Sequence, residues 1–132
     1  MELRFHHVGV IVSSIKKSLD HYKLMFSENK ISKEFHIASQ GVKVCFIETG
    51  NNVFLELIEP VDEGGSVAHL IEKKIKYYHA GYVVSNMDQT IDYLCSKDFK
   101  HLETFSSEAF DGKRCAFLYT PELHLIELIE KK

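Results

Sequence analysis

The chain has 132 residues, of which 45% are hydrophobic and 11% are aromatic, and its formal net charge is −3. This length suits one compact domain with a substantial core. The mildly acidic and evenly mixed charge excludes a basic surface for nucleic acid or membrane, and no apolar run approaches the length of a membrane span.

The cysteines indicate a reducing environment. Cys45, Cys95 and Cys115 are odd in number and include no C-x-x-C pair. Neither a disulfide framework nor a zinc finger is therefore expected. We expect a cytoplasmic protein whose cysteines are ordinary apolar residues.

The first predicted element is an apolar strand over residues 5–12, in the stretch "FHHVGVIVSS". Ile15, Leu19, Tyr22 and Phe26 follow at helical spacing, which predicts an amphipathic helix with Ser13 or Ser14 as its N-cap. Later apolar segments predict further strands, of which the clearest in this half are residues 42–48 and 53–59.

The second half of the chain repeats this order. A strand is predicted over residues 77–84, and Met87, Ile91 and Leu94 then recur at helical spacing. The clearest strands after this helix are residues 114–119 and 124–130.

The two halves match residue by residue, so the chain consists of two copies of one unit. His7, Gly9, Val12 and Asp20 correspond to His79, Gly81, Val84 and Asp92, and Phe46, Glu56 and Glu59 correspond to Phe117, Glu127 and Glu130. Such ordered matches are typical of an internal repeat. We predict an α+β fold with a βαβββ unit over residues 5–60, a linker over 61–76 and a second βαβββ unit over 77–131, all within one domain spanning residues 1–132.

Strand alternation places one histidine and one glutamate of each unit on corresponding faces. Side chains two residues apart share a face, so His7 lies on the side of Gly9, while Val8, Val10 and Val12 lie on the other. The same alternation places Glu56 between Phe54 and Ile58 on a largely apolar strand face. His79 and Glu127 repeat this arrangement in the second unit.

A metal site explains this duplicated set best. An unpartnered buried glutamate costs several kcal/mol, so such a group must be paired or must bind metal. Two imidazoles and two carboxylates supply four N and O ligands to one divalent ion and leave two octahedral positions open. We therefore expect one divalent ion per chain, such as Co, Ni, Zn or Mn, bound by His7, Glu56, His79 and Glu127.

Paired βαβββ units with this ligand pattern resemble the vicinal oxygen chelate superfamily, and the resemblance covers essentially the whole chain. The segments "QGVKVCFIETGNNVFLELIEP" at 40–60 and "SVAHLIEKK" after it are most similar to methylmalonyl-CoA epimerase, with small bacterial glyoxalases I second. The resemblance implies a glyoxalase-like fold, in which the two units form an eight-stranded open mixed sheet with the metal in its concave face. It also implies that the metal ligands are His7, Glu56, His79 and Glu127.

The implied activity is metal-dependent proton transfer α to a carbonyl, through an enediolate held on the metal. A positioned carboxylate base contributes roughly 10²–10⁴-fold to such a reaction. By analogy, Glu127 is the principal base, and Glu56 is a ligand and partner acid or base. The substrate would be a small molecule, either an acyl-CoA thioester in an epimerase or a hemithioacetal in a glyoxalase I.

Two other readings are less favoured by the sequence. A dioxygenase would use two histidines and one carboxylate, so the additional Glu56 argues against it. A small-molecule binding protein needs no metal ligands, so four inward ligands argue against that reading as well. We expect no nucleic-acid or membrane partner, and we expect a homodimer.

Overall fold

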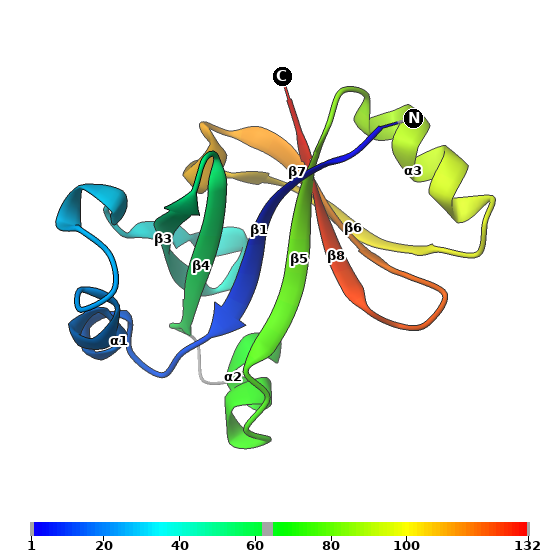
Figure 1. The fold of residues 1–132 in the computed structure, drawn as a ribbon. Helices are drawn as coiled ribbons and strands as arrows, with labels where there is room; N and C mark the ends of the chain where they lie inside the picture. Colours follow the sequence, from blue (N-terminus) through cyan, green and yellow to red (C-terminus); the bar gives the residue numbers. More distant parts are fainter. Residues whose placement is uncertain (1, 62–64, 132) are drawn as a thin grey trace. The chain divides into compact units, whose positions relative to one another are not determined.

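The computed structural model describes residues 2–61 and 65–131, which separate into two compact units (Figure 1). The first unit comprises residues 7–78, and the second comprises residues 1–6 and 79–132. Residues 62–64 of the predicted linker lie outside the described residues.

The first half of the chain contains β1 (Arg4–Ile11), α1 (Ile15–Tyr22), η1 (Glu28–Lys30), β2 (Phe35–Ile37), η2 (Ala38–Gln40), β3 (Val42–Gly50), β4 (Val53–Pro60) and α2 (Ser66–Glu72). The second half contains β5 (Tyr77–Val84), α3 (Met87–Cys95), β6 (Lys100–Ser107), η3 (Glu108–Phe110), β7 (Lys113–Tyr119) and β8 (Leu125–Glu130).

The strands of the two halves pair in the same way. In the first half β1 runs parallel to β4, β4 runs antiparallel to β3, and β3 runs antiparallel to β2. In the second half β5 runs parallel to β8, β8 runs antiparallel to β7, and β7 runs antiparallel to β6. Each half is therefore a βαβββ unit with four strands. The predicted glyoxalase-like α+β fold with an eight-stranded mixed open sheet is confirmed.

Helices α1 and α3 begin where the sequence predicts, but α1 ends before the apolar pattern of its sequence does. The hydroxyl of Ser14 accepts a hydrogen bond from the Lys17 amide, so Ser14 is the N-cap of α1. The helix ends at Tyr22. Phe26 lies beyond the helix, although it still packs against the apolar core that contains Ile15. The N-cap of α3 is Asn86, whose side chain accepts from the Gln89 amide.

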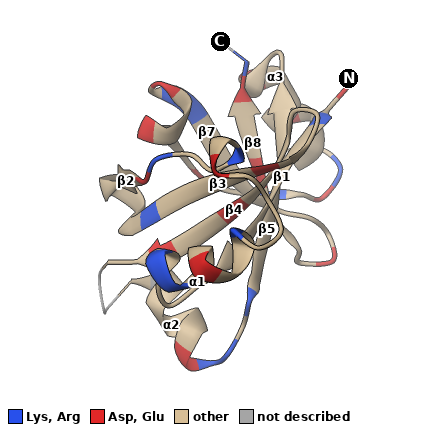
Figure 2. Cartoon of the chain, turned by 60° about the vertical axis from the view of Figure 1, so that its left-hand side comes forward, with Lys and Arg blue, Asp and Glu red and all other residues tan. Residues whose placement is uncertain are grey.

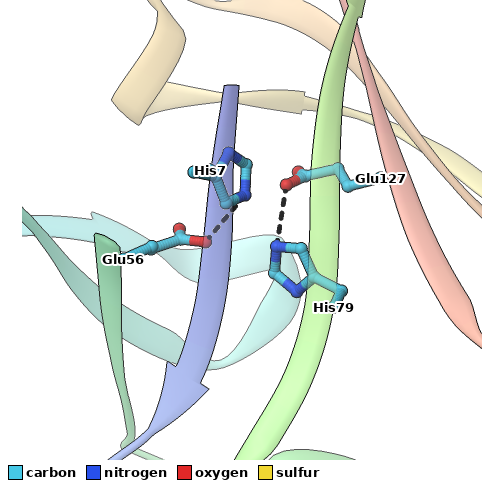
Figure 3. A group of neighbouring side chains, drawn as sticks. All are labelled: His7, Glu56, His79 and Glu127. Carbon is cyan, nitrogen blue, oxygen red and sulfur yellow. Dashed lines mark ion pairs between the residues drawn. The ribbon is translucent and has the colours of Figure 1, made fainter. Parts of the chain in front are cut away.

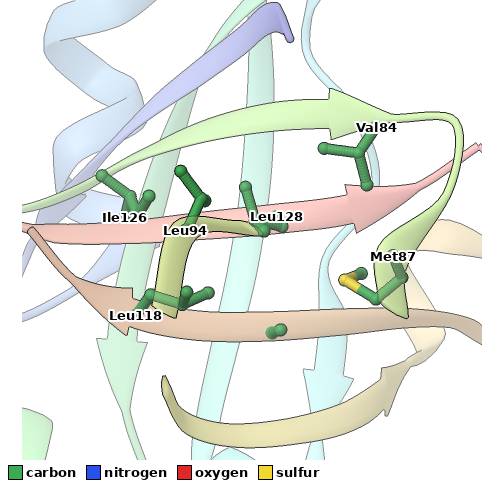
Figure 4. Close-up of a cluster of buried hydrophobic side chains, with 7 residues drawn as sticks. Val84, Met87, Leu94, Leu118, Ile126 and Leu128 are labelled. Atoms are coloured by element: carbon green, nitrogen blue, oxygen red, sulfur yellow. The ribbon is translucent and has the colours of Figure 1, made fainter. Parts of the chain in front are cut away.

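Each unit has its own apolar core on the helix side of its strands. In the first unit Ile15 of α1 packs with three fully buried strand residues, Cys45, Ile47 and Leu57, and the half-buried Val10 packs against them. In the second unit the equivalent cluster joins α3 to strands β5, β7 and β8 (Figure 4). Its buried members are Val84, Met87, Leu94, Ala116, Leu118, Ile126 and Leu128. These cores bury one face of each sheet and leave the other face to the histidines and glutamates.

A second repeated glutamate stabilises the start of each helix. Glu59, at the end of β4, accepts a hydrogen bond from the backbone N–H of Ile15 at 2.8 Å. In the second unit Glu130 pairs with the guanidinium of Arg114, which holds the pKa of Glu130 below its ordinary value, and Glu130 also accepts a hydrogen bond from the Met87 amide. The first N–H groups of a helix have no partner within the helix, so a carboxylate at this end is favourable.

The described residues include no helix that is both long and apolar enough to cross a membrane.

We predict that Glu59→Ala will lower the free energy of unfolding by about 1 kcal/mol, because the Ile15 amide then loses its acceptor at the helix N-terminus. Chemical denaturation followed by circular dichroism measures this change. Glu122→Ala is the matched control, because Glu122 is exposed in the turn before β8. Equal stability of the two variants would show that the contact between Glu59 and α1 contributes nothing.

Candidate metal-binding site

The first unit holds a buried pair formed by His7 and Glu56. His7 is 0% exposed and Glu56 is 4% exposed, and the Nε2 atom of His7 lies 3.2 Å from Oε1 of Glu56 (Figure 3). The parallel register of β1 and β4 sets Gly9 directly opposite Glu56. His7 and Glu56 therefore come from adjacent strands, and the residue beside the glutamate has no side chain to cover it.

The second unit repeats this pair with His79 and Glu127. These residues are 2% and 4% exposed, and Nε2 of His79 lies 3.1 Å from Oε1 of Glu127 (Figure 3). Gly81 on β5 stands opposite Glu127 on β8, as Gly9 stands opposite Glu56. The two halves of the sequence repeat thus make the same contact, from Nε2 of the histidine to Oε1 of the glutamate.

An aromatic ring packs against each histidine. Phe46 lies opposite Glu56 in the register of β3 and β4, and its ring meets the edge of His7 at 6.0 Å between centroids. Phe117 lies opposite Glu127, and its ring meets His79 at 5.5 Å. Both rings are nearly buried, at 7% and 6% exposure. They hold the imidazoles in place and surround the carboxylates with apolar atoms.

The four donors fit a divalent metal ion. All four side chains are buried and of the kinds that bind metal: imidazole nitrogen and carboxylate oxygen. A buried carboxylate costs several kcal/mol unless a cation or a hydrogen-bond donor meets it. In each pair Nε2 faces Oε1, so a proton there can satisfy both atoms, and a metal ion competes with that proton for the same lone pairs.

Two other histidines with described contacts, His6 and His101, lie apart from these pairs. His6 alternates away from His7 along β1 and meets the ring of Phe110 edge-to-face at 5.4 Å between centroids. His101 is exposed and lies 2.9 Å from the Thr104 hydroxyl on β6. Neither residue belongs to a His–Glu pair.

Sequence reasoning assigned no role to two pairs of repeated residues that shape the site. Phe46 and Phe117 match in the repeat, yet nothing in the sequence distinguishes a ring that supports a histidine from an ordinary core phenylalanine. Glu59 and Glu130 also match, and they cap helices rather than bind a ligand. The signal that could have separated Glu56 from Glu59 is parity, since they lie three residues apart and so point to opposite faces of β4.

The comparison with protein families settles the membership of the chain. The model for the Glyoxalase/Bleomycin resistance protein/Dioxygenase superfamily matches residues 6–117. The chain belongs to this superfamily. The predicted resemblance is confirmed, and the match includes three of the four paired side chains: His7, Glu56 and His79.

Solved structures share the fold over the whole chain. A hypothetical protein, BH1468 from Bacillus halodurans, is 28% identical, with a TM-score of 0.86 over 100% of this chain and 96% of that one. Methylmalonyl-CoA epimerase from Mycobacterium tuberculosis is 21% identical, with a TM-score of 0.84 over 98% of this chain and 88% of that one.

A third structure carries a bound ligand. A variant of methylmalonyl-CoA epimerase from Streptomyces coelicolor in complex with 2-nitronate-propionyl-CoA is 20% identical, with a TM-score of 0.81 over 98% of this chain and 95% of that one. No curated protein matches the sequence. At these identities the two epimerases show the fold that this superfamily member shares with them, and the reaction has to be argued from its own residues.

Proposed function

We propose that His7, Glu56, His79 and Glu127 bind one divalent metal ion together, and that the protein catalyses proton transfer α to a carbonyl. The observation that carries this proposal is the exact repetition of a buried His–Glu pair, at 3.2 and 3.1 Å, on equivalent strands of the two units. A single pair can be explained as a satisfied polar contact in a core. Two equivalent pairs in a superfamily with this fold are better explained by a shared ligand.

The metal ion would be Co, Ni, Zn or Mn, and the donor set is compatible with each of them. When bound, the ion polarises the substrate carbonyl and neutralises the developing negative charge, an effect of several kcal/mol. The apolar residues around the pairs, chiefly Phe46 and Phe117, exclude water and so strengthen every charge interaction in the site.

Glu127 is the proposed principal base. Its carboxylate has two oxygens, so one could serve as a metal ligand while the other takes the proton from the carbon next to the carbonyl. Its low exposure keeps the base away from bulk water. Glu56 is the partner acid or base, and it returns a proton to the opposite side of the same carbon in an epimerisation.

The proposed substrate is an acyl-CoA thioester of the methylmalonyl-CoA type. Support comes from the segment at residues 40–60 and from the epimerases among the similar structures, one of which is bound to an acyl-CoA analogue. A glyoxalase I acting on a hemithioacetal is the second candidate. The segment "YTPELHL" at residues 119–125 departs from the H-P-K-like segment that epimerases commonly carry before the last strand, and this departure argues against the acyl-CoA substrate.

The oligomeric state and the cellular compartment complete the proposal. We propose that the protein is a homodimer and that it works in the cytoplasm, where a reducing environment keeps Cys45, Cys95 and Cys115 as thiols. A non-catalytic role in binding small molecules is the less favoured reading of the same fold.

We expect protein purified without chelators or metal-affinity resin to contain about one divalent ion per chain, as four protein ligands to a single ion require. His79→Ala removes one ligand and should reduce the metal content sharply. His6→Ala is the matched control, since His6 is the neighbour of His7 that packs on Phe110. Elemental analysis measures both variants. Equal metal content in the two would contradict the assignment of His79 as a ligand.

We expect Glu127→Gln to lower kcat by a factor within the roughly 10²–10⁴ range of general base catalysis, because the amide keeps an oxygen but loses nearly all basicity. Metal content should fall much less than kcat. The measurement is exchange of the α-proton in D₂O, followed by NMR, with candidate thioesters and hemithioacetals. If Glu127→Gln exchanges as fast as the unchanged protein, Glu127 is not the base.

A further inference from the structure

The second unit carries a groove beside α3, outside its His–Glu pair. The groove consists of two pockets, of about 540 and about 330 Å³, which share Glu2 and Ser85 in their linings and are therefore contiguous. The first described residues and the end of β8 lie near α3 (Figure 2), and all the lining residues belong to the second unit. We call this surface the α3 groove. Its charged, aromatic and hydrogen-bonding residues include Glu2, Arg4, Ser85, Gln89, Tyr93 and Lys131.

One end of the α3 groove presents two cations. Arg4 and Lys131 line the smaller pocket, and both side chains are exposed. Within the described residues neither of them forms an ion pair, whereas Arg114 of the same unit is held by Asp88 and Glu130. Guanidinium and ammonium groups bind phosphate through strong, charge-assisted hydrogen bonds. Arg4 and Lys131 are therefore able to receive a phosphate group of a ligand.

The other end of the α3 groove presents an aromatic ring. Tyr93 is 51% exposed on α3, and the ammonium of Lys97 lies over its ring at 6.0 Å. An exposed aromatic ring is a platform on which a nucleobase stacks. Gln89 lines the same pocket, and its amide offers both a hydrogen-bond donor and an acceptor to the edge of such a base. This end of the groove therefore suits a purine.

The separation between this groove and the proposed base fits coenzyme A. Lys131 directly follows β8, and its backbone N–H donates to the carbonyl of Val84 at 2.9 Å, so it continues the strand. It comes four residues after Glu127, which corresponds to about 13 Å along a strand, and alternation places it on the side of Glu127. The extended pantetheine arm of coenzyme A, which joins the thioester to the diphosphate, covers this distance.

We infer that the α3 groove binds the nucleotide end of the acyl-CoA substrate, with its phosphates on Arg4 and Lys131 and its adenine stacked on Tyr93. The inference rests on the proposed function and places the part of the substrate that is farthest from the reacting carbon. Glu2 lies along both pockets, where its carboxylate can accept a hydrogen bond from the ribose between phosphate and base. The hemithioacetal of a glyoxalase I has no nucleotide, so an occupied groove favours the acyl-CoA substrate over that alternative.

Two unreactive ligands that differ only in the nucleotide test this inference. Desulfo-coenzyme A lacks the thiol that could bind a metal, and N-ethylpantothenamide is the same molecule cut before its diphosphate. Calorimetric titration of the full chain should show desulfo-coenzyme A binding at least about tenfold more tightly, because charge-assisted hydrogen bonds and base stacking are both strong contacts. The difference should shrink as salt is added. Equal binding of the two ligands, or no binding of desulfo-coenzyme A, would overturn the inference.

Variants with matched controls locate the nucleotide. Lys131→Glu and Tyr93→Ala should each weaken the binding of desulfo-coenzyme A about tenfold or more. Lys16→Glu makes the same change of charge on the exposed face of α1, and Tyr77→Ala removes a ring that is 50% exposed at the start of β5. Neither control residue lines the groove. An affinity that is unchanged in the groove variants, or that falls equally in the controls, would refute the assignment.

Proton exchange connects the groove with the proposed function. A coenzyme A thioester and the N-acetylcysteamine thioester of the same acyl group differ in the nucleotide, and binding energy from that remote end contributes to kcat/KM. The ratio of the two kcat/KM values should fall at least about tenfold in Lys131→Glu and stay the same in Lys16→Glu. An unchanged ratio in Lys131→Glu would overturn the inference.

The titration and the exchange assay fail separately. If thioesters exchange their α-protons but desulfo-coenzyme A binds no better than N-ethylpantothenamide, the α3 groove is not the nucleotide site and the proposed function stands. If desulfo-coenzyme A binds through Lys131 and Tyr93 but no thioester or hemithioacetal exchanges, the nucleotide site stands and the proposed function is wrong.

Discussion

The constraint on which the rest of the structure depends is that each buried carboxylate needs a partner. Glu56 and Glu127 are each 4% exposed in apolar surroundings, where an uncompensated charge would cost several kcal/mol, a large share of the stability of a small domain. Each fold unit therefore supplies an imidazole on the neighbouring parallel strand, 3.2 or 3.1 Å from the carboxylate. The crossover that makes these strands parallel neighbours, with α1 or α3 between them in sequence, places the histidine beside the glutamate.

The same strands serve both the core and the site because successive side chains alternate. On β4 the residues Glu56 and Leu57 point to opposite faces, one beside His7 and the other into the core against α1. Glu59 again points to the helix side and holds the first turn of α1. Thus one strand stabilises the fold and presents a ligand, and a shift of its register by one residue would exchange the two roles.

Most of this arrangement could be predicted from the sequence because it is present twice. A single H-x-G at a strand start carries little information, but His7 and His79 followed by Gly9 and Gly81 in matched positions indicate a shared function.

The strands that the sequence analysis did not locate are β2 and β6. β2 has only three residues, and β6 carries mostly exposed residues, with a bulge between His101 and Glu103 that interrupts its alternation. Edge strands of this kind lack the apolar periodicity on which sequence reasoning depends. The role of the rings beside the histidines was likewise hidden, because the repeated Phe46 and Phe117 resemble ordinary core phenylalanines in the sequence.

The central claim is that two His–Glu pairs, one from each unit, bind a single ion. Crystals of the full chain grown with Co²⁺ and measured at the cobalt absorption edge test it most directly. We predict one anomalous peak per chain, bonded to the Nε2 atoms of His7 and His79 and to carboxylate oxygens of Glu56 and Glu127. Two separate peaks, one at each pair, or no peak at either pair, would contradict the account.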